Sequence, residues 1–491
     1  MLRGTAAGQR TIGLVPQTPV QPATRPLLGI GRVPRTLVAA LLAAVLLLPA
    51  SAAAKGPTVR GEIARLAQKG EIVPEQATAW RADYDNAQAT LKKLHGTRFR
   101  ELRAVVVNVN DAARRHQLTP SRLPAMFMTL RRNRDWWAIK PLPHGGQRTS
   151  FPPSQLVWQY YPGQGWQIQW LATFGIANAL WSYGGKDDEL RRLLDEALTY
   201  ATQRAGGIAF EYLFRFDGGT PPWVSGLAQG TGLSALSRGA VRLKSPRYFD
   251  AARQALGIFK TKPPAGVRYT RSTGVHYLQY SYAPTLRIAN GFTQALNGLH
   301  DFAALANDEE GRTLFASGER ELRHELPQFD TGAWSLYSKP GKESDLGYHK
   351  VLRDFVQNLC DRLTKAGDSP SPKLYCSTAA RFTKDLTTPP KVTFTLPKKP
   401  RAKQTITVRF ALDKISTVTI AATRRGKVVY SVTRRYAHGR HTLKLTPSAA
   451  GALTLRATSV DLAGNTGSDQ AVLRVKAVPK KKTPKRRHEK D

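Results

Sequence analysis

The segment Pro221–Gly232, which reads PPWVSGLAQGTG, decides the fold class of this chain. Its glycines, alanines and hydroxyl residues form a small-residue helical run. About fifty residues later, Tyr277–Pro284 reads YLQYSYAP, and Asn290–Phe292 reads NGF. Aromatic rings stack on sugar rings, while hydroxyls and amides bond to sugar hydroxyls. These clusters therefore favour a wall that binds a sugar over a plain hydrophobic core.

Helices of this apolar, small-residue type recur along the chain. They are predicted to begin about 61 residues apart, near Gly165, Gly226, Arg287 and Tyr348. Between them the sequence predicts three charged, amphipathic helices, at 190–204, 245–260 and 310–325. This alternation predicts an incomplete (α/α) toroid of helix hairpins over residues 151–385. In such a ring, the loops before the inner helices line a central cleft.

Two further folded regions flank the toroid in the prediction. Residues 55–150 form a helical cap, because apolar residues recur there at steps of three and four. Residues 386–478 contain seven short alternating segments with turn signals between them, which predicts an immunoglobulin-like β-sandwich. The composition changes near residue 385, so we expect the sandwich to be dispensable for chemistry and to contribute adhesion. Residues 479–491 form a basic tail that is predicted to be disordered.

The first 54 residues contain a predicted export signal with a long polar region before it. The apolar run Leu37–Ala54 follows arginines and ends in small residues, as in a secretory signal peptide. The alternative is an N-terminal membrane anchor, although the run is short for a span and Pro49 interrupts it. We therefore expect a secreted or cell-surface protein. Export favours a disulfide between the two cysteines, Cys360 and Cys376, over a reactive cysteine–histidine site.

The charge of the chain predicts a polyanionic partner. It has 74 lysines and arginines against 35 aspartates and glutamates, and a net charge of +39. Such a charge attracts nucleic acids, anionic glycans and anionic surfaces. No nucleic-acid-binding module is recognisable, so an anionic polysaccharide is favoured, and the basic tail would add attraction to an anionic cell surface. Neither a metal-ligand spacing nor a nucleotide fingerprint occurs, so we expect no metal and no cofactor.

Four aromatic and polar clusters fall at the predicted inner-helix starts, and together they resemble a known family. Over about residues 160–363, their order is similar to the C-terminal catalytic domain of D-glucuronyl C5-epimerases. The matching segments are Tyr161–Gln169, Trp223–Gly230, Tyr280 with Asn290–Phe292, Phe329–Tyr337 and Tyr348-His349. Enzymes of this family invert C5 of a uronic acid within a polymer. The resemblance thus implies an isomerase, a carbohydrate epimerase that needs no cofactor.

The resemblance also implies the roles of individual residues. The acid and base candidates are Tyr280, Tyr337 and Tyr348. A tyrosine can act as a base if nearby cations lower its pKa. The substrate-binding candidates are Tyr161, Gln164, Gln167, Trp223, Ser225, Gln229, Arg287, Asn290 and His349. Lys339 and Lys350 are further cations that could face the uronate carboxylate.

Departures from the family pattern leave other functions open. Gln279 stands where the family has an acidic residue, and an amide cannot act as a general base. One alternative is a non-catalytic glycan- or cell-wall-binding protein on the same scaffold. Another is a uronate lyase, which removes the same proton and then eliminates. A glycoside hydrolase is disfavoured because it needs two carboxylates, and the clusters offer only Glu211, Asp217 and Asp330.

Overall fold

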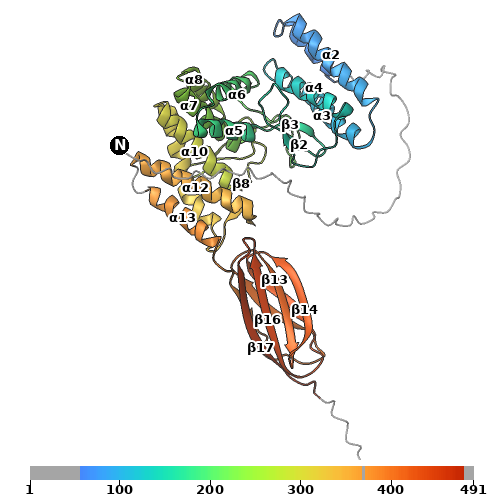
Figure 1. Cartoon of the computed structure of the whole chain (residues 1–491), viewed down its shortest axis with the longest axis vertical. Helices are drawn as coiled ribbons and strands as arrows, with labels where there is room; N and C mark the ends of the chain where they lie inside the picture. The colour runs from blue at the N-terminus through green and yellow to red at the C-terminus, as the bar shows by residue number, and fades with distance from the viewer. Residues whose placement is uncertain (1–55, 368–370, 480–491) are drawn as a thin grey trace, which may run out of the picture. The chain divides into compact units, whose positions relative to one another are not determined.

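The computed structural model describes residues 56–367 and 371–479 (Figure 1). The predicted signal peptide and most of the predicted tail lie outside these residues. The described chain is mainly helical, with several small sheets, and it divides into two compact units between Val224 and Ser225. No helix within the described residues has both the length and the apolar character that a membrane crossing requires.

The first unit begins with the helices that the sequence predicts. They are α1 (Val59–Gln68), α2 (Pro74–Leu91), α3 (Gly96–Arg114) and α4 (Leu123–Ile139). A small sheet then forms from β1 (Arg148–Thr149), β2 (Trp158–Tyr161) and β3 (Gly165–Ile168). The unit continues with α5 (Trp170–Tyr183), α6 (Asp187–Thr199), β4 (Thr202–Arg204) and β5 (Gly207–Ala209).

The second unit starts with three successive helix pairs separated by short strands. Its first part contains α7 (Gly226–Arg242), α8 (Arg247–Ala255), α9 (Gly257–Lys260), β6 (Arg268–Thr270) and β7 (Val275–Tyr277). Next come β8 (Arg287–Ile288), α10 (Ala289–Leu305), α11 (Glu309–Glu325), the 3-10 helix η1 (Leu326–Phe329), β9 (Leu336–Lys339) and β10 (Lys342–Glu343). The last pair is α12 (Leu346–Ala366) and α13 (Ser371–Asp385). Helix α10 packs against both α7 and α12, so the apolar helices of successive pairs are neighbours.

The small-residue run of α7 exists because α10 crosses it at backbone contact distance. A Cβ atom added to Gly298 would lie 1.9 Å from the carbonyl oxygen of Gly230. A Cβ atom added to Gly230 would lie 2.6 Å from the Cα atom of Ala295. Only glycine leaves room for such an approach. The predicted small-residue helix is thus present as α7, and its glycines are explained by the crossing with α10.

The strands between the helices are a feature that the sequence analysis did not predict. Residues near Gly165 were expected to begin a helix, but β2 and β3 form an antiparallel hairpin there, and α5 begins at Trp170. Gly163 and Gly165 have φ angles of 77° and 70°, which turn the chain between the two strands. The predicted helix over 190–204 likewise ends at Thr199 and gives way to β4.

Residues 392–475 form two antiparallel sheets around one hydrophobic core. The strands are β11 (Val392–Thr395), β12 (Ile406–Leu412), β13 (Ser416–Arg424), β14 (Lys427–Tyr436), β15 (Gly439–Leu445), β16 (Gly451–Asp461) and β17 (Thr466–Val475). One sheet has the order β11-β12-β15 and the other β14-β13-β16-β17, whose strands lie side by side in Figure 1. Alternate residues such as Val408, Phe410, Ile420 and Leu455 from the two sheets fill the shared core. The period-two pattern thus correctly predicted seven strands.

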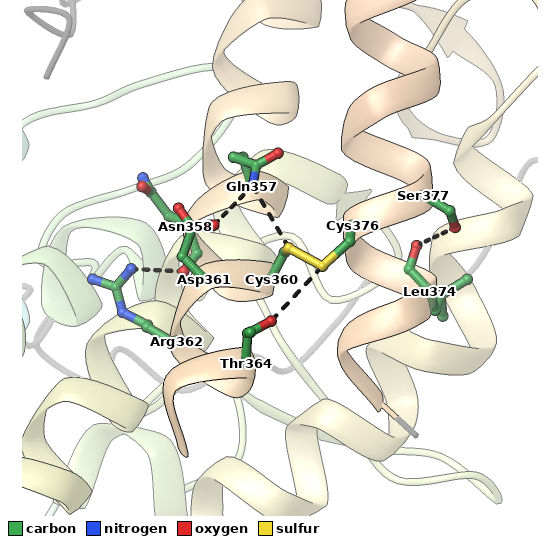
Figure 2. Close-up of a disulfide and its surroundings, with 9 residues drawn as sticks. All are labelled: Gln357, Asn358, Cys360, Asp361, Arg362, Thr364, Leu374, Cys376 and Ser377. Carbon is green, nitrogen blue, oxygen red and sulfur yellow. Dashed lines mark hydrogen bonds between the residues drawn. A yellow bond between two sulfur atoms is a disulfide. The ribbon is translucent and has the colours of Figure 1, made fainter. Parts of the chain in front are cut away.

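A disulfide joins the last helix pair (Figure 2). Cys360 of α12 is bonded to Cys376 of α13, with 5.0 Å between the two Cα atoms. The bond closes a loop that, in the chain-entropy model, stabilises the fold by roughly 3 kcal/mol. In the part of the chain that the structure describes, no cysteine is left free to act as a nucleophile.

Candidate functional site

Three tyrosines from distant parts of the sequence meet in the second unit. Tyr280 follows β7, Tyr337 lies on β9, and Tyr348 lies in the first turn of α12. The ring centres of Tyr337 and Tyr348 are 4.6 Å apart. The hydroxyl of Tyr337 forms hydrogen bonds with those of Tyr280 and Tyr348. The structure therefore brings together all three acid and base candidates, which we call the tyrosine cluster.

Short local structures place each tyrosine. Strand β9 pairs with β8 on one side and β10 on the other, and alternation along β9 buries Leu336 and Ser338. Tyr337, between them, points to the opposite side. Asp345 caps α12, since its carboxylate accepts a hydrogen bond from the Tyr348 N–H at 2.8 Å. This cap fixes the start of α12, and with it the position of Tyr348.

The glycine of the NGF segment makes room for Gln279. A Cβ atom on Gly291 would lie 2.4 Å from Gln279 Oε1. With no side chain there, the Gln279 amide packs against the start of α10, and its Nε2 donates to the Tyr280 hydroxyl at 2.9 Å. Gln279 also forms a hydrogen bond with Tyr337. The residue that departs from the family pattern is thus an integral part of the tyrosine cluster.

Two buried acceptor atoms at this site have no hydrogen-bond partner. They are Gln279 Oε1 and Asn290 Oδ1, both on side chains that are almost fully buried. If the Gln279 amide were turned over, its nitrogen would be left unpaired instead. A buried acceptor without a donor is costly, by about 1–3 kcal/mol. Sugar hydroxyls are donors that would satisfy both atoms.

Burial sets the protonation state of the cluster. It raises the pKa values of Tyr280, Tyr337 and Tyr348 well above the ordinary value of tyrosine. All three are therefore neutral at neutral pH. The sequence hypothesis asked for cations that lower these pKa values, but burial outweighs any such effect. One cation that the sequence analysis did not name lies close, because the Lys342 ammonium is 5.8 Å from the centre of the Tyr337 ring.

Arg287 lies on the strand next to Tyr337 and is held by a buried carboxylate. Its guanidinium donates to Glu325 Oε1 at 2.8 Å, and His276 Nδ1 lies 2.8 Å from Glu325 Oε2. Burial alone would raise the Glu325 pKa, but the hydrogen bonds to His276 and Arg287 lower it to about 2. Arg287 is opposite Lys339 in the β8–β9 register. Arg287 and Lys339 are thus neighbouring cations on adjacent strands, and both remain candidates to face the carboxylate of a uronate substrate.

The other candidates of the second unit contribute to its packing. The Ser225 hydroxyl caps α7 by accepting from the Ala228 N–H at 3.3 Å. Gln229, one turn later, is buried in α7. Lys350 lies in the first turns of α12 and is exposed.

The candidates of the first unit have protein partners within that unit. Tyr161 accepts a hydrogen bond from Gln169 Nε2 at 2.7 Å. Gln164 Oε1 accepts from Asn108, and Gln167 Nε2 donates to the Gln164 carbonyl at 2.6 Å. Trp223 stacks on Tyr212 with ring centres 4.3 Å apart. These contacts hold the side chains within the first unit, and their place in one cleft with the tyrosines stays a prediction.

His349 has a position that favours packing over substrate binding. Its side chain is 0% exposed, and its ring stacks on Trp334 with centres 3.8 Å apart. Nε2 donates to the Phe382 carbonyl at 2.9 Å, and Nδ1 accepts from the Ser335 N–H at 3.2 Å. Both ring nitrogens are therefore occupied by the protein.

We expect His349 to make the fold sensitive to acid. Burial lowers its pKa from 6.5 to about 4, so the neutral ring is favoured in the folded state. The stability this provides is present above pH 6.5 and is lost as pH falls through 4, amounting to about 3 kcal/mol. Urea unfolding of the wild type and His349→Gln at about pH 7 and pH 4 should show a smaller loss in the variant. Equal losses in both proteins would show that His349 does not titrate on unfolding.

The sequence of this region has known relatives. The family described as D-glucuronyl C5-epimerase C-terminus matches residues 204–367. The D-glucuronyl C5-epimerase of Caenorhabditis elegans is 34% identical over 130 residues, covering 24% of this chain and 21% of that protein. An uncharacterized protein of Methanocaldococcus jannaschii is 24% identical over 136 residues, covering 27% of this chain and 44% of that protein. The chain thus spans less than half the length of these curated relatives.

Solved structures of sugar epimerases are also similar to the chain. A sugar epimerase from a ruminal bacterium shows 12% identity and a TM-score of 0.32, covering 44% of this chain and 58% of that one. A cellobiose 2-epimerase from Bacillus thermoamylovorans shows 11% identity and a TM-score of 0.33, covering 59% of this chain and 74% of that one.

The described residues contain no group of three or more histidines, cysteines or carboxylates arranged to hold a metal ion.

Proposed function

Because residues 204–367 of this chain belong to the D-glucuronyl C5-epimerase C-terminal family, we propose that the protein inverts C5 of a uronic acid within an anionic polysaccharide. The observation that carries this proposal is the tyrosine cluster. Three tyrosine hydroxyls, which the motif places up to 68 residues apart, are joined by hydrogen bonds beside two unpaired buried acceptors.

The chemistry of the reaction fits such a cluster. The C5 proton lies next to a carboxylate and is very weakly acidic, so its removal needs a base and stabilisation of the negative charge that develops. Inversion further needs an acid on the opposite face of the sugar. Burial and the contact with Tyr280 raise the pKa of Tyr337, whereas its hydrogen bonds with Gln279 and Tyr348 stabilise the ionised form. The neutral tyrosine neighbours are the proton donors.

The uronate carboxylate must also be neutralised for the proton to leave. Lys342 beside the Tyr337 ring, and Arg287 and Lys339 on the paired strands, are the cations available on this sheet. Arg287 already shares Glu325, so its charge is partly compensated. We therefore assign the carboxylate contact to Lys342 and Lys339, with Arg287 holding the strand pair in place.

A heavy-water incubation tests the proposed reaction. Uronate polymers are incubated with the protein, and NMR follows replacement of the C5 proton by deuterium. The epimerase proposal predicts deuterium at C5 with unchanged chain length. A lyase would instead shorten the chains and create an absorbing double bond, while a hydrolase would shorten them without C5 exchange. Absence of C5 exchange on every uronate polymer would reject an epimerase.

A second candidate function is a glycan-binding protein without turnover. The observation that favours it is Gln279, which replaces an acidic residue and lies within the tyrosine cluster. Under this alternative, the protein retains polymers of the correct type but exchanges no C5 proton. Retention on an immobilised polymer, combined with the heavy-water result, separates the two functions.

The finer architecture belongs to the same proposal. The pairs α7/α8, α10/α11 and α12/α13 repeat along the chain, and α10 contacts both neighbouring apolar helices. This repetition supports an incomplete (α/α) toroid. The two sheets at residues 392–475, with seven strands and one shared core, support an immunoglobulin-like sandwich. We also propose export through the segment 1–54, in keeping with a polysaccharide outside the cell.

The sandwich presents a cationic face to such a polymer. Arg409, Arg440 and Lys444 point outward from the three-stranded sheet, where Arg409 is directly opposite Thr442. Each of the other two cations is therefore a diagonal neighbour of Arg409, roughly 7–8 Å away. No carboxylate lies on the outer face of these strands. An anionic glycan would relieve the repulsion among the three charges.

We expect charge removal at this face to weaken retention on an anionic polysaccharide matrix. The triple variant R409Q/R440Q/K444Q should elute at clearly lower salt than the wild type, because exposed charge pairs are screened by salt. The control K69Q/K92Q/K93Q removes three exposed charges from the first unit. If both variants shifted equally, net charge rather than this face would govern retention.

A further inference from the structure

The hairpin that carries Tyr337 is bound at its open end by the β-sandwich. Glu343 is the last residue of β10, and its side chain is only 4% exposed. Oε1 accepts from the Ile415 N–H at 2.9 Å, and Oε2 accepts from the His438 N–H at 2.8 Å. The His438 ring nitrogen Nδ1 is a third contact at 3.1 Å. Both carboxylate oxygens of Glu343 are thus used by two loops of the sandwich.

A buried lysine of the sandwich contacts the same open end of the hairpin, at Trp334. Lys414 is 0% exposed, and its ammonium lies 5.6 Å from the centre of the Trp334 ring. The ammonium donates to the Asp385 carbonyl at 2.9 Å and to Asp461 at 3.1 Å. A buried charge of this kind persists only with such partners. The Lys414 ammonium is therefore held in place by these two hydrogen bonds.

Trp334 contacts both elements that carry a tyrosine of the cluster, the hairpin with Tyr337 and the helix α12 with Tyr348. Its indole N–H donates to the Ser344 carbonyl at 2.9 Å, which closes the hairpin between residues 334 and 344. Its ring stacks on His349, the neighbour of Tyr348 in α12. The hairpin with Tyr337 and the first turn with Tyr348 are thus held against one another through side chains that the sandwich contacts.

We propose that the sandwich positions the tyrosine cluster, with Glu343 and Lys414 as the positioning residues. Neither touches the tyrosines, so both act through the hairpin 334–344. This inference revises the expectation that the sandwich is dispensable for chemistry. It rests on the proposed function only for its kinetic readout, since the order of the hairpin is a property of the protein alone.

The test uses full-length Glu343→Ala and Glu343→Gln. Glutamine keeps one carbonyl acceptor, and therefore one of the two backbone hydrogen bonds. We expect amide hydrogen exchange of peptides within 334–349 to become roughly tenfold faster in Glu343→Ala, with a smaller change in Glu343→Gln, while α7 and α10 keep their protection. The control is Asp469→Asn, since Asp469 accepts from the Phe394 N–H at 2.7 Å within the sandwich itself.

The kinetic arm separates positioning from general destabilisation. Misplaced catalytic groups lower kcat, and a displacement of about 1 Å can cost roughly 100-fold. We expect a kcat for C5 exchange at least about tenfold lower in Glu343→Ala, with KM little changed, partial recovery in Glu343→Gln, and wild-type kinetics in Asp469→Asn. Wild-type protection of 334–349 in Glu343→Ala would overturn the inference. So would faster amide exchange with unchanged kcat. If the wild-type protein exchanged no C5 proton, the proposed function would fail while the amide-exchange arm still decided the positioning role.

Discussion

Replacement of Tyr280, Tyr337 or Tyr348 by phenylalanine is expected to slow C5 exchange by roughly 100-fold or more in each variant. Each substitution keeps the buried ring and removes only the hydroxyl that moves the proton. Because the three hydroxyls share hydrogen bonds, combined variants should lose less than the product of the single effects. Rates from the heavy-water NMR assay measure these losses directly.

The matched control for these variants is Tyr277→Phe. Tyr277 is fully buried on β7, and its hydroxyl donates to the Leu314 carbonyl at 2.7 Å, outside the tyrosine cluster. This variant also loses one buried hydroxyl, so it reports the cost of that change to the fold. Its exchange rate should stay within a few-fold of the wild type. Near-wild-type rates in all three cluster variants would show that these tyrosines only pack.

Substitution of Gly298 by alanine is expected to lower the free energy of unfolding by about 3 kcal/mol or more, or to prevent folding. The added methyl group would lie 1.9 Å from the Gly230 carbonyl oxygen. Both atoms belong to helix backbones or are fixed to them, so no side-chain rotation relieves the overlap. Helices α7 and α10 must separate, which opens the core between them.

Urea unfolding followed by far-ultraviolet circular dichroism measures this loss. Gly61→Ala is the control, because Gly61 lies in the exposed part of α1, and its Cβ atom would meet only the Thr58 hydroxyl at 3.0 Å. That variant should remain close to the wild type. A Gly298→Ala protein with unchanged stability would mean that the two helices do not cross at these glycines.

The sequence predicted the elements whose patterns are long or chemically distinctive. The small-residue run within Pro221–Gly232 correctly indicated a helix, and period-two alternation correctly indicated the seven strands near the C-terminus. The resemblance to the epimerase family supplied the three tyrosines. Their convergence was expected from their places near successive predicted helix starts; in the structure Tyr280 follows β7, Tyr337 lies on β9 and only Tyr348 lies in a first helical turn.

The short strands could not be predicted because they contain too few residues to show the two-residue alternation of apolar and polar side chains that identifies a strand. Strands such as β8 and β10 have two residues each, and β8 pairs with a segment about fifty residues away. Glu343 was missed for a similar reason, since a single carboxylate at the end of a two-residue strand has no sequence pattern. His349 was named because it follows Tyr348 in the motif. In α12, however, successive residues point about 100° apart, which turns His349 toward the core.

The pKa values of the cluster also required the structure. The sequence hypothesis considered cations near the tyrosines, but it could not weigh them against burial. In the structure, burial dominates and keeps all three hydroxyls protonated at neutral pH. The base form must therefore arise within the hydrogen-bonded cluster around Tyr337.

The most direct test of the account is the isotope at C5 of newly inverted uronate residues formed by the wild-type protein in heavy water. If one tyrosine removes the proton and another returns one from the opposite face, the returned hydrogen comes from a group that has exchanged with the solvent. The account therefore predicts that inverted residues carry deuterium at C5. Inverted residues that retain protium, or a polymer with no inverted residues, would contradict it.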